Sequence, residues 1–189
     1  MKRIAIFASG TGTNAENIVN YFSGHEYINV HMAFVNKKKV QVIERMIKHH
    51  VPVVFFNRQM FYETDYILDL LLMNKIDMIV LAGFLWLFPV PVINAYEGRI
   101  VNIHPALLPK YGGKGMYGMR VHESVWENKE TESGITIHYI NEEYDKGEHI
   151  LQKKCSIDKT DTPEIIAKKV HQLEYDFFPK VVEGLLMNQ

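Results

Sequence analysis

The fold is decided near the start of the chain, by the stretch Arg3-Ile-Ala-Ile-Phe-Ala-Ser-Gly-Thr-Gly-Thr-Asn-Ala15. Every residue from Ile4 to Ala8 is apolar, which indicates a strand that is buried on both faces instead of one that alternates. The residues from Ser9 to Thr13 are small and include two glycines, so the chain can turn tightly there before a helical pattern begins at Asn14. A buried strand that turns into a helix is the first half of a βαβ unit.

More apolar runs follow, separated by helical patterns. We expect strands at residues 3–8, 29–36, 53–57, 77–82 and 99–104, and helices at 14–22, 40–49, 61–74 and 89–95. Strands separated by helices imply parallel pairing through right-handed crossovers. The first half of the sequence therefore predicts an open, Rossmann-like α/β sheet.

The pattern changes after Pro109, where the stretch Tyr111-Gly-Gly-Lys-Gly-Met-Tyr-Gly118 predicts a glycine-rich loop. A helix is expected at 121–128, and the runs at 135–140 and 149–157 alternate as antiparallel strands do. A long amphipathic helix is expected after the cap residues that begin at Thr160, with Pro163 at about its first position and a kink near Pro179. The predicted fold class is α/β: a single domain over residues 1–189 with a mostly parallel sheet flanked by helices and an antiparallel C-terminal part.

The composition excludes several classes of protein. The 189 residues are 47% hydrophobic, with 21 Lys and Arg against 22 Asp and Glu, so neither disorder nor a strongly basic nucleic-acid-binding surface is indicated. One cysteine, Cys155, cannot form an internal disulfide, and no apolar run approaches the roughly 20 residues that span a bilayer. We expect a cytoplasmic protein that binds neither nucleic acid nor membrane.

The glycine-rich turn after the first strand is a candidate anion site. Free N–H groups at the start of a helix bind phosphate well, and Gly12, Thr13 and Asn14 occupy that position. The same stretch also fits G-x-G-x-x-A, the dinucleotide fingerprint, which calls for an acidic residue after the second strand. That strand instead ends in Asn36 and Lys37. Phosphate binding, dinucleotide binding and a merely structural turn all stay open, and the first is favoured.

A second candidate site is Asn102-Ile-His104-Pro105, at the carboxyl end of a predicted buried strand. Period 2 places Asn102 and His104 on one face, where an amide donor and an imidazole could stabilise an oxyanion and move a proton. A satisfied polar network in the core is the alternative. Asp145, in Asp-x-Gly147, could orient the imidazole, although Asp-x-Gly is also a common turn. No metal site is indicated, because Trp126 stands where a zinc-protease helix that begins with His122 and Glu123 would carry its second His.

Taken together, several motifs resemble the phosphoribosylglycinamide formyltransferases of purine biosynthesis, in order and spacing over nearly the whole chain. These motifs are Ser9-Gly-Thr-Gly-Thr-Asn14, Leu81-Ala-Gly-Phe84, Asn102-Ile-His-Pro105, Leu107-Leu-Pro-Lys-Tyr111, Gly134-Ile-Thr-Ile-His138 and Asp145-x-Gly147. The resemblance implies formyl transfer from 10-formyltetrahydrofolate to glycinamide ribonucleotide, both small molecules, without a metal. The protein would act as a monomer or homodimer.

The resemblance also implies roles for individual residues. Asn102 and His104 would stabilise a tetrahedral intermediate, with Asp145 paired to the imidazole. The acceptor would be bound through Gly12, Thr13 and Asn14 at its phosphate, through Glu174 at its ribose, and through His171. The folate site would comprise Leu85, Trp86, Phe88, Ile93, Ile100, Ile140, Asn141, Glu142, Glu143 and Tyr144.

Three departures from the family pattern carry expectations of their own. Trp86 stands where an Arg is usual, which predicts weak recognition of the glutamate tail of the folate unless Arg58 or Lys114 supplies the cation. His171 replaces a Lys or Gln. The segment 111–121 is longer than usual and predicts a mobile loop over the acceptor site. The alternatives are another folate-dependent formyltransferase or hydrolase, an NADP-binding Rossmann protein, and a non-catalytic phosphate-binding module.

Overall fold

One mixed sheet organises the computed structural model of the chain, which describes residues 1–188. Its strand order is β3-β2-β1-β4-β5-β6-β7. The parallel strands are β1 (Lys2–Ala8), β2 (Ile28–Val35), β3 (Val53–Phe55), β4 (Met78–Leu81) and β5 (Ile100–His104). β6 (Glu132–Tyr139) and β7 (His149–Ser156) are antiparallel. The predicted α/β class, with its antiparallel C-terminal part, is confirmed.

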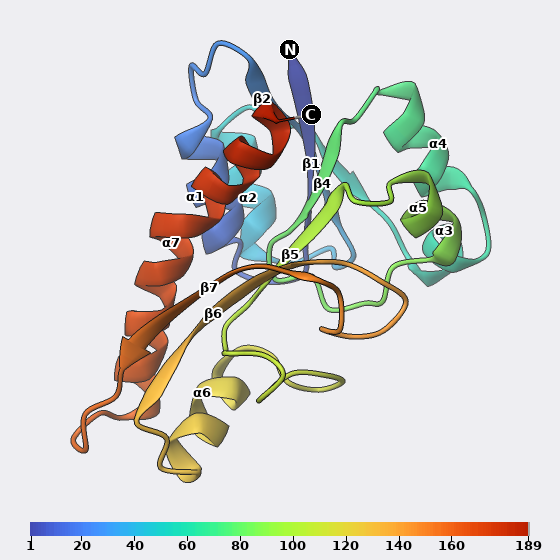
Figure 1. Cartoon of the computed structure of the whole chain (residues 1–189). Helices are drawn as coiled ribbons and strands as arrows, with labels where there is room; N and C mark the ends of the chain where they lie inside the picture. The colour runs from blue at the N-terminus through green and yellow to red at the C-terminus, as the bar shows by residue number, and fades with distance from the viewer. Residues whose placement is uncertain (189) are drawn as a thin grey trace.

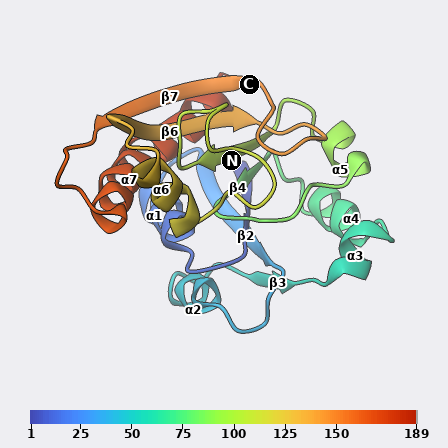
Figure 2. The same ribbon diagram turned by 90° about the horizontal axis from the view of Figure 1, so that it is seen from below.

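Helices cover both faces of the sheet (Figures 1 and 2). One face carries α1 (Thr13–Tyr21), α2 (Gln41–Lys48) and α7 (Pro163–Met187), while the other carries α3 (Arg58–Tyr62), α4 (Tyr66–Met73) and α5 (Val90–Ala95). The remaining helix, α6 (Met119–Glu127), packs against α7. Each face has its own hydrophobic core because successive residues of a strand point to opposite sides. Ile4 and Ile6 of β1 therefore enter one core, and Ala5 and Phe7 enter the other.

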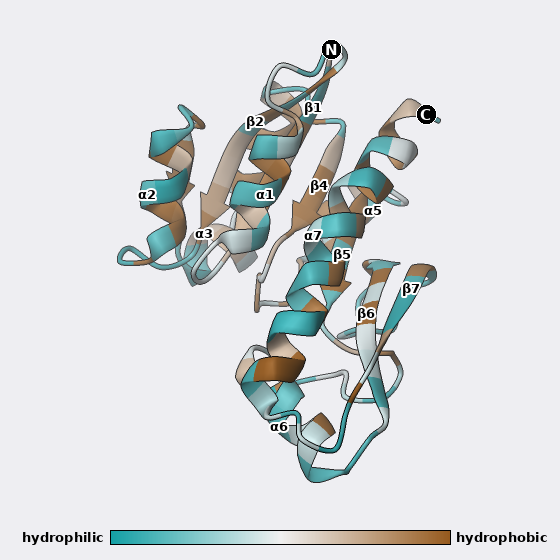
Figure 3. Cartoon of the chain, turned by 90° about the vertical axis from the view of Figure 1, so that its left-hand side faces the viewer, coloured by the Kyte–Doolittle hydropathy of each residue, from teal (hydrophilic) through white to brown (hydrophobic). Residues whose placement is uncertain are grey.

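The hydropathy of the elements explains this layering. β4 is hydrophobic along its length, whereas α1, α2 and α7 carry hydrophilic and hydrophobic residues side by side (Figure 3). A strand between two helical layers has no solvent-facing side, and a surface helix has one. β1 lies between β2 and β4, so the connection after β1 leads to one side of that strand and the later connection from β3 to β4 leads to its other side. Open α/β sheets bind ligands at such a switch point, beyond the carboxyl ends of the strands.

The helix expected at 61–74 is wrong in one respect, since it is two helices, α3 and α4. The hydroxyl of Thr64 donates a hydrogen bond to the Met60 carbonyl (3.0 Å) and accepts one from the Tyr66 N–H (3.3 Å). Such local bonds compete with the helical ladder and interrupt it. The strand expected at 53–57 ends earlier, at Phe55, because the Asn57 side chain caps α3 by accepting the Met60 N–H (2.9 Å).

The last helix, α7, continues through Pro179 (Figure 1). Proline has no N–H, so the carbonyl four residues earlier, that of Tyr175, receives no helical hydrogen bond from it. Asn17 of α1 replaces the missing donor, with its Nδ2 3.1 Å from that carbonyl oxygen. The carbonyl that Pro179 leaves free thus forms a polar contact between α1 and α7.

β7 is an edge strand that pairs with β6 alone. Its side chains alternate between exposed and half-buried positions over most of its length, and exposed Lys154 bonds Glu132 of β6 at 2.7 Å. Among residues 1–188, no helix is long and apolar enough to cross a membrane.

Candidate functional site

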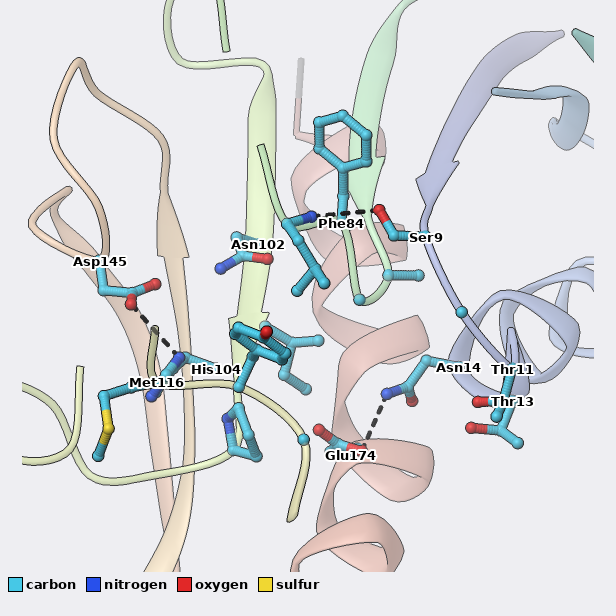
Figure 4. A pocket seen from close by; sticks show the side chains of 18 of the residues that line it. Ser9, Thr11, Thr13, Asn14, Phe84, Asn102, His104, Met116, Asp145 and Glu174 are labelled. Carbon is cyan, nitrogen blue, oxygen red and sulfur yellow. Dashed lines mark hydrogen bonds and ion pairs between the residues drawn. The ribbon is translucent and has the colours of Figure 1, made fainter. Parts of the chain in front are cut away.

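A cavity of about 570 Å³ opens beyond the carboxyl ends of β1, β4 and β5. It is lined by the loop between β1 and α1, by the ends of β4 and β5, by residues 113–118, and by side chains from α6 and α7. Figure 4 shows how labelled residues from these segments converge on it. The three predicted catalytic residues, the three residues of the predicted phosphate loop, His171 and Glu174 all line this one cavity.

The loop between β1 and α1 is built around Gly12. This residue has φ 77°, in the left-handed region, and a Cβ there would lie 2.4 Å from the Cβ of buried Val42. Glycine is therefore required both by the turn and by the close approach of α2. The turn directs the free N–H groups at the start of α1 toward the cavity, which is a favourable place for an anion. Lys37, which forms no ion pair in the described chain, also lines the cavity.

Asn102 is oriented by His138, its direct neighbour across β5 and β6. Nδ1 of His138 lies 2.8 Å from the Tyr139 carbonyl, which can only accept, so in the neutral ring Nε2 is the acceptor. Asn102 Nδ2 lies 3.1 Å from that Nε2. One N–H of the amide is thus used by His138, and the second remains for a ligand in the cavity. His138 ends the motif Gly134-Ile-Thr-Ile-His138, but no pattern in the sequence indicates its contact with Asn102.

His104 is buried, with 4% of its surface exposed, and faces Asp145. Its Nδ1 lies 3.5 Å from Oδ2 of Asp145, and its Nε2 lies 2.7 Å from the Tyr111 carbonyl oxygen. Burial lowers the pKa of His104 below its ordinary value, although Asp145 and that carbonyl act in the opposite direction. The imidazole is therefore held neutral near pH 7 and can accept a proton.

Asp145 also contacts a second ring, with Oδ1 3.6 Å from Nε2 of His138, and its Oδ2 accepts the Gly113 N–H at 2.8 Å. Burial would raise the pKa of this carboxyl, but the positive charge that His138 and His104 carry when protonated and the Gly113 N–H hold it below its usual value. Asp145 thus stays ionised and can stabilise an imidazolium at His104. Its φ of 55° is unusual for a residue other than glycine, and such strain is often found at functional sites.

The far end of the cavity contains Glu174, His171 and His122. Burial raises the pKa of Glu174 to about 7, although a hydrogen bond from Asn14 Nδ2 (2.9 Å) acts against this. His122 lies on α6 with its ring centroid 6.1 Å from that of His171, and burial lowers its pKa to about 4. Helical periodicity does not indicate that Glu174 is buried, and only the family resemblance assigns it to the site. His122 appears in the sequence only at the start of an incomplete zinc-protease pattern.

The residues predicted to bind folate lie in different parts of the structure, and only some of them line the cavity. Leu85 and Tyr144 line the cavity, and the hydroxyl of Tyr144 lies 3.5 Å from the Leu85 carbonyl. The apolar members Trp86, Phe88, Ile93, Ile100 and Ile140 belong to the hydrophobic core on the α3–α5 face. Asn141, Glu142 and Glu143 lie in the connection between β6 and β7 and do not line the cavity. The folate site stays a prediction.

Residues 1–188 contain no cluster of three or more His, Cys, Asp or Glu side chains arranged to hold a metal ion. Cys155 is half-buried in β7, and burial raises the pKa of its thiol.

Known proteins that are similar to this chain agree with the geometry of the cavity. Residues 2–182 match the formyl transferase family model. A phosphoribosylglycinamide formyltransferase of Bacillus subtilis (strain 168) is 35% identical over 98% of this chain and 95% of its own length. The chloroplastic phosphoribosylglycinamide formyltransferase of Arabidopsis thaliana is 38% identical over 97% of this chain, which spans 65% of that relative's length.

Solved structures give the same relationship. The phosphoribosylglycinamide formyltransferase of Bacillus halodurans superposes with a TM-score of 0.86 at 36% identity, covering 98% of this chain and 95% of the other. Glycinamide ribonucleotide transformylase 1 of Geobacillus kaustophilus superposes with a TM-score of 0.87 at 34% identity, covering 98% and 99%. The chain belongs to the formyl transferase family, and within it to the group of the phosphoribosylglycinamide formyltransferases.

Proposed function

We propose that this chain transfers the formyl group of 10-formyltetrahydrofolate to the amino group of glycinamide ribonucleotide. The observation that carries the proposal is one continuous cavity, with an anion site at the start of α1 and the group Asn102, His104 and Asp145 in the same space. The names of the relatives support this choice of donor and acceptor. In this proposal residues 1–189 act as one formyltransferase domain in the cytoplasm, as a monomer or homodimer, without metal or nucleic acid.

The acceptor side has the polarity of a ribonucleotide. The free N–H groups of Thr13 and Asn14, with Lys37 nearby, suit a phosphate. Glu174 accepts only one hydrogen bond from the described chain, from Asn14, and therefore has room for ribose hydroxyl donors. Asn14 Oδ1 is buried without a partner, which is costly unless a ligand or water supplies one. Nε2 of His171 lies 3.8 Å from Oε2 of Glu174, and in this proposal His171 contacts the phosphate.

Each catalytic side chain then has a defined task. The free N–H of Asn102 stabilises the charge that develops on the formyl oxygen when the acceptor amine attacks. Nδ1 of His104 takes the proton that the amine loses and returns it to the nitrogen of the donor as the C–N bond of the formyl donor breaks. Asp145 stabilises the imidazolium between these two transfers. The donor supplies only the activated formyl group.

The donor enters, in this proposal, where Leu85 and Tyr144 meet the cavity. Their 3.5 Å contact is long for a hydrogen bond between a hydroxyl and a carbonyl. Separating them would admit a flat ring system between the segment that ends β4 and the connection from β6 to β7. In this proposal the wall behind the entrance would be formed by apolar residues of the core on the α3–α5 face, namely Trp86, Phe88, Ile93, Ile100 and Ile140.

The proposal is tested by incubating the full chain with glycinamide ribonucleotide and 10-formyltetrahydrofolate and measuring the release of tetrahydrofolate. Release should require both substrates and should be lost in His104→Ala. Release without the acceptor would indicate a hydrolase. Release that is slow with glycinamide ribonucleotide but fast with another amine would indicate a different formyltransferase. Tight NADP binding without transfer would favour the dinucleotide alternative, and phosphate binding without turnover would favour a binding module.

A further inference from the structure

Tyr111, the last residue of the motif Leu107-Leu-Pro-Lys-Tyr111, contacts the proposed proton-transfer residue His104 through its main chain. Its carbonyl oxygen lies 2.7 Å from Nε2 of His104. A carbonyl has no proton to donate, so this contact exists only when Nε2 carries the proton. In the neutral ring Nδ1 is then the free base, and it is Nδ1 that faces Asp145 at 3.5 Å. The tautomer of His104 is thus set from outside the catalytic group.

The backbone of Tyr111 adopts an unusual conformation to make this contact. Its φ is 57°, in the left-handed region that residues with a Cβ seldom occupy. Two residues later the Gly113 N–H donates to Oδ2 of Asp145 at 2.8 Å. One short segment therefore supplies an acceptor to His104 and a donor to Asp145.

The side chain of Tyr111 is fixed at its other end. Its hydroxyl donates to Oε1 of Glu130 at 2.9 Å, and the same oxygen accepts from Nζ of Lys110 at 2.9 Å. The ring packs against the hydrophobic core between these contacts. Since a bond to a charged acceptor is among the stronger hydrogen bonds, it can hold the strained backbone in place.

We propose that Tyr111, anchored by Glu130, is a positioning residue. The carbonyl of Tyr111 keeps His104 in the tautomer with the proton on Nε2, so that Nδ1 exchanges protons with the substrate. This inference deepens the proposed function and rests on it for the consequence in catalysis. The other titratable groups near His104 are Asp145, His138 of β6 and His122 of α6. Of these, only Asp145 lies toward Nδ1 at salt-bridge distance, so none replaces Tyr111 at Nε2.

The test uses the full chain with ¹⁵N-labelled histidine, in which the two ring nitrogens report which of them carries the proton. The signals of His104 are assigned by their absence in His104→Gln. The wild-type protein should show the proton on Nε2. Tyr111→Phe and Glu130→Ala should both show a second tautomer and a kcat lowered about tenfold, the scale of one lost hydrogen bond to a charged group, with both KM values within about twofold.

Two further variants serve as controls. Glu132→Gln removes a neighbouring ion pair, with Lys154, but leaves Tyr111 untouched, so tautomer and kcat should stay as in the wild type. Glu130→Gln keeps an acceptor oxygen for the Tyr111 hydroxyl and should restore most of the wild-type behaviour even if Glu130→Ala does not fold. Because Tyr111 and Glu130 act through one bond, their double variant should cost no more than either single one.

A wild-type proton on Nδ1 would overturn the inference, as would a loss of kcat in Tyr111→Phe with an unchanged tautomer. An unchanged tautomer and an unchanged kcat in both Tyr111→Phe and Glu130→Ala would overturn it too. The spectrum needs no substrate, so failure of the proposed function and failure of this inference are separate results. A chain with the Nε2 proton and no transfer activity would contradict only the former.

Discussion

Asn102, His104 and Asp145 are three side chains that act, in our proposal, on a single reacting carbon. We expect Asn102→Ala, His104→Ala and Asp145→Ala each to lower kcat about 100-fold or more, the scale for loss of an acid–base or oxyanion group. Double variants should fall far short of additive losses because the groups act on one intermediate. Steady-state kinetics with both substrates is the measurement.

The exposed histidine of β7 provides a control for these variants, since His149→Ala removes an imidazole that lies outside the cavity. Its kcat should equal that of the wild type. Wild-type turnover without His104 would return Asn102 and His104 to the role of a polar network in the core.

Glu174 predicts a pH dependence of stability. With a folded pKa of about 7 against an ordinary 4.5, the folded chain binds more protons than the unfolded chain between these values. Stability is therefore fully present below pH 4.5 and is lost as the pH rises through 7. Glu174→Gln should remove this loss, raising the free energy of unfolding at pH 8 by up to about 3 kcal/mol, since one pKa unit corresponds to roughly 1.4 kcal/mol.

Denaturant titrations at pH 4 and pH 8 measure this effect, and the gain should vanish at pH 4. The same substitution should raise the acceptor KM, because a neutral amide accepts ribose hydroxyls less strongly than a carboxylate. An equal gain at both pH values would show that ionisation of Glu174 is not its cause.

At the scale of elements, the turn between β1 and α1 requires glycine at position 12. Gly12→Val should lower Tm markedly, because the new Cβ meets Val42 and φ is 77°. Strain at a left-handed position alone costs on the order of 1–3 kcal/mol. Gly10→Ala is the matched control, since a Cβ at Gly10 has no atom within 4 Å. Calorimetry on both variants decides this, and similar Tm values would contradict the argument.

Some elements can be predicted from local sequence patterns, while other features depend on contacts that form only in the folded protein. Apolar runs located all five parallel strands, because burial on both faces leaves a local signal. The break between α3 and α4 depends on the Thr64 hydroxyl. A threonine within a helical pattern can either remain in the helix or interrupt it, so the sequence does not predict the break. The pairing of Asn102 with His138 depends on the register of β5 with β6, which only the folded sheet defines. The buried face of α7 includes Ile166, Val170, Glu174, Phe178, Val182 and Leu186. A search for apolar residues at helical spacing does not identify Glu174, because its side chain is a carboxylate.

At the scale of the whole molecule, we expect recognition of the donor's tail to combine two segments that are distant in the sequence. The guanidinium carbon of Arg58, at the start of α3, lies 4.9 Å from the ring centroid of Trp86, beyond β4. Arg58 is one of the two residues that the sequence offers as a cation in place of the usual Arg. We expect Arg58→Met to raise the KM of a glutamylated donor about tenfold, since a charged hydrogen bond contributes roughly 1.5–3 kcal/mol, and to leave a tail-less donor unaffected.

Arg99→Met is the matched control, since Arg99 also lies over an aromatic ring, that of Tyr96 at 4.7 Å, but directly precedes β5, at the end of that strand opposite to the cavity. A donor series of increasing tail length, measured for all three proteins, tests this. A wild-type KM that is independent of tail length would show that Arg58 binds no carboxylate.

The open edge of the sheet has a consequence for behaviour at high concentration. β7 presents unpaired N–H and C=O groups that another chain's strand could join, which is the usual route to ordered aggregates. Its exposed side chains include Lys154, whereas the ammonium of Lys153 lies 5.0 Å from the ring centroid of Phe177 in α7. Adding a strand there would require the exposed ammonium group of Lys154 to lose water against a second polypeptide, which is unfavourable. Lys154 thus disfavours self-templated polymerisation, while the opposite face of β7 packs on α7.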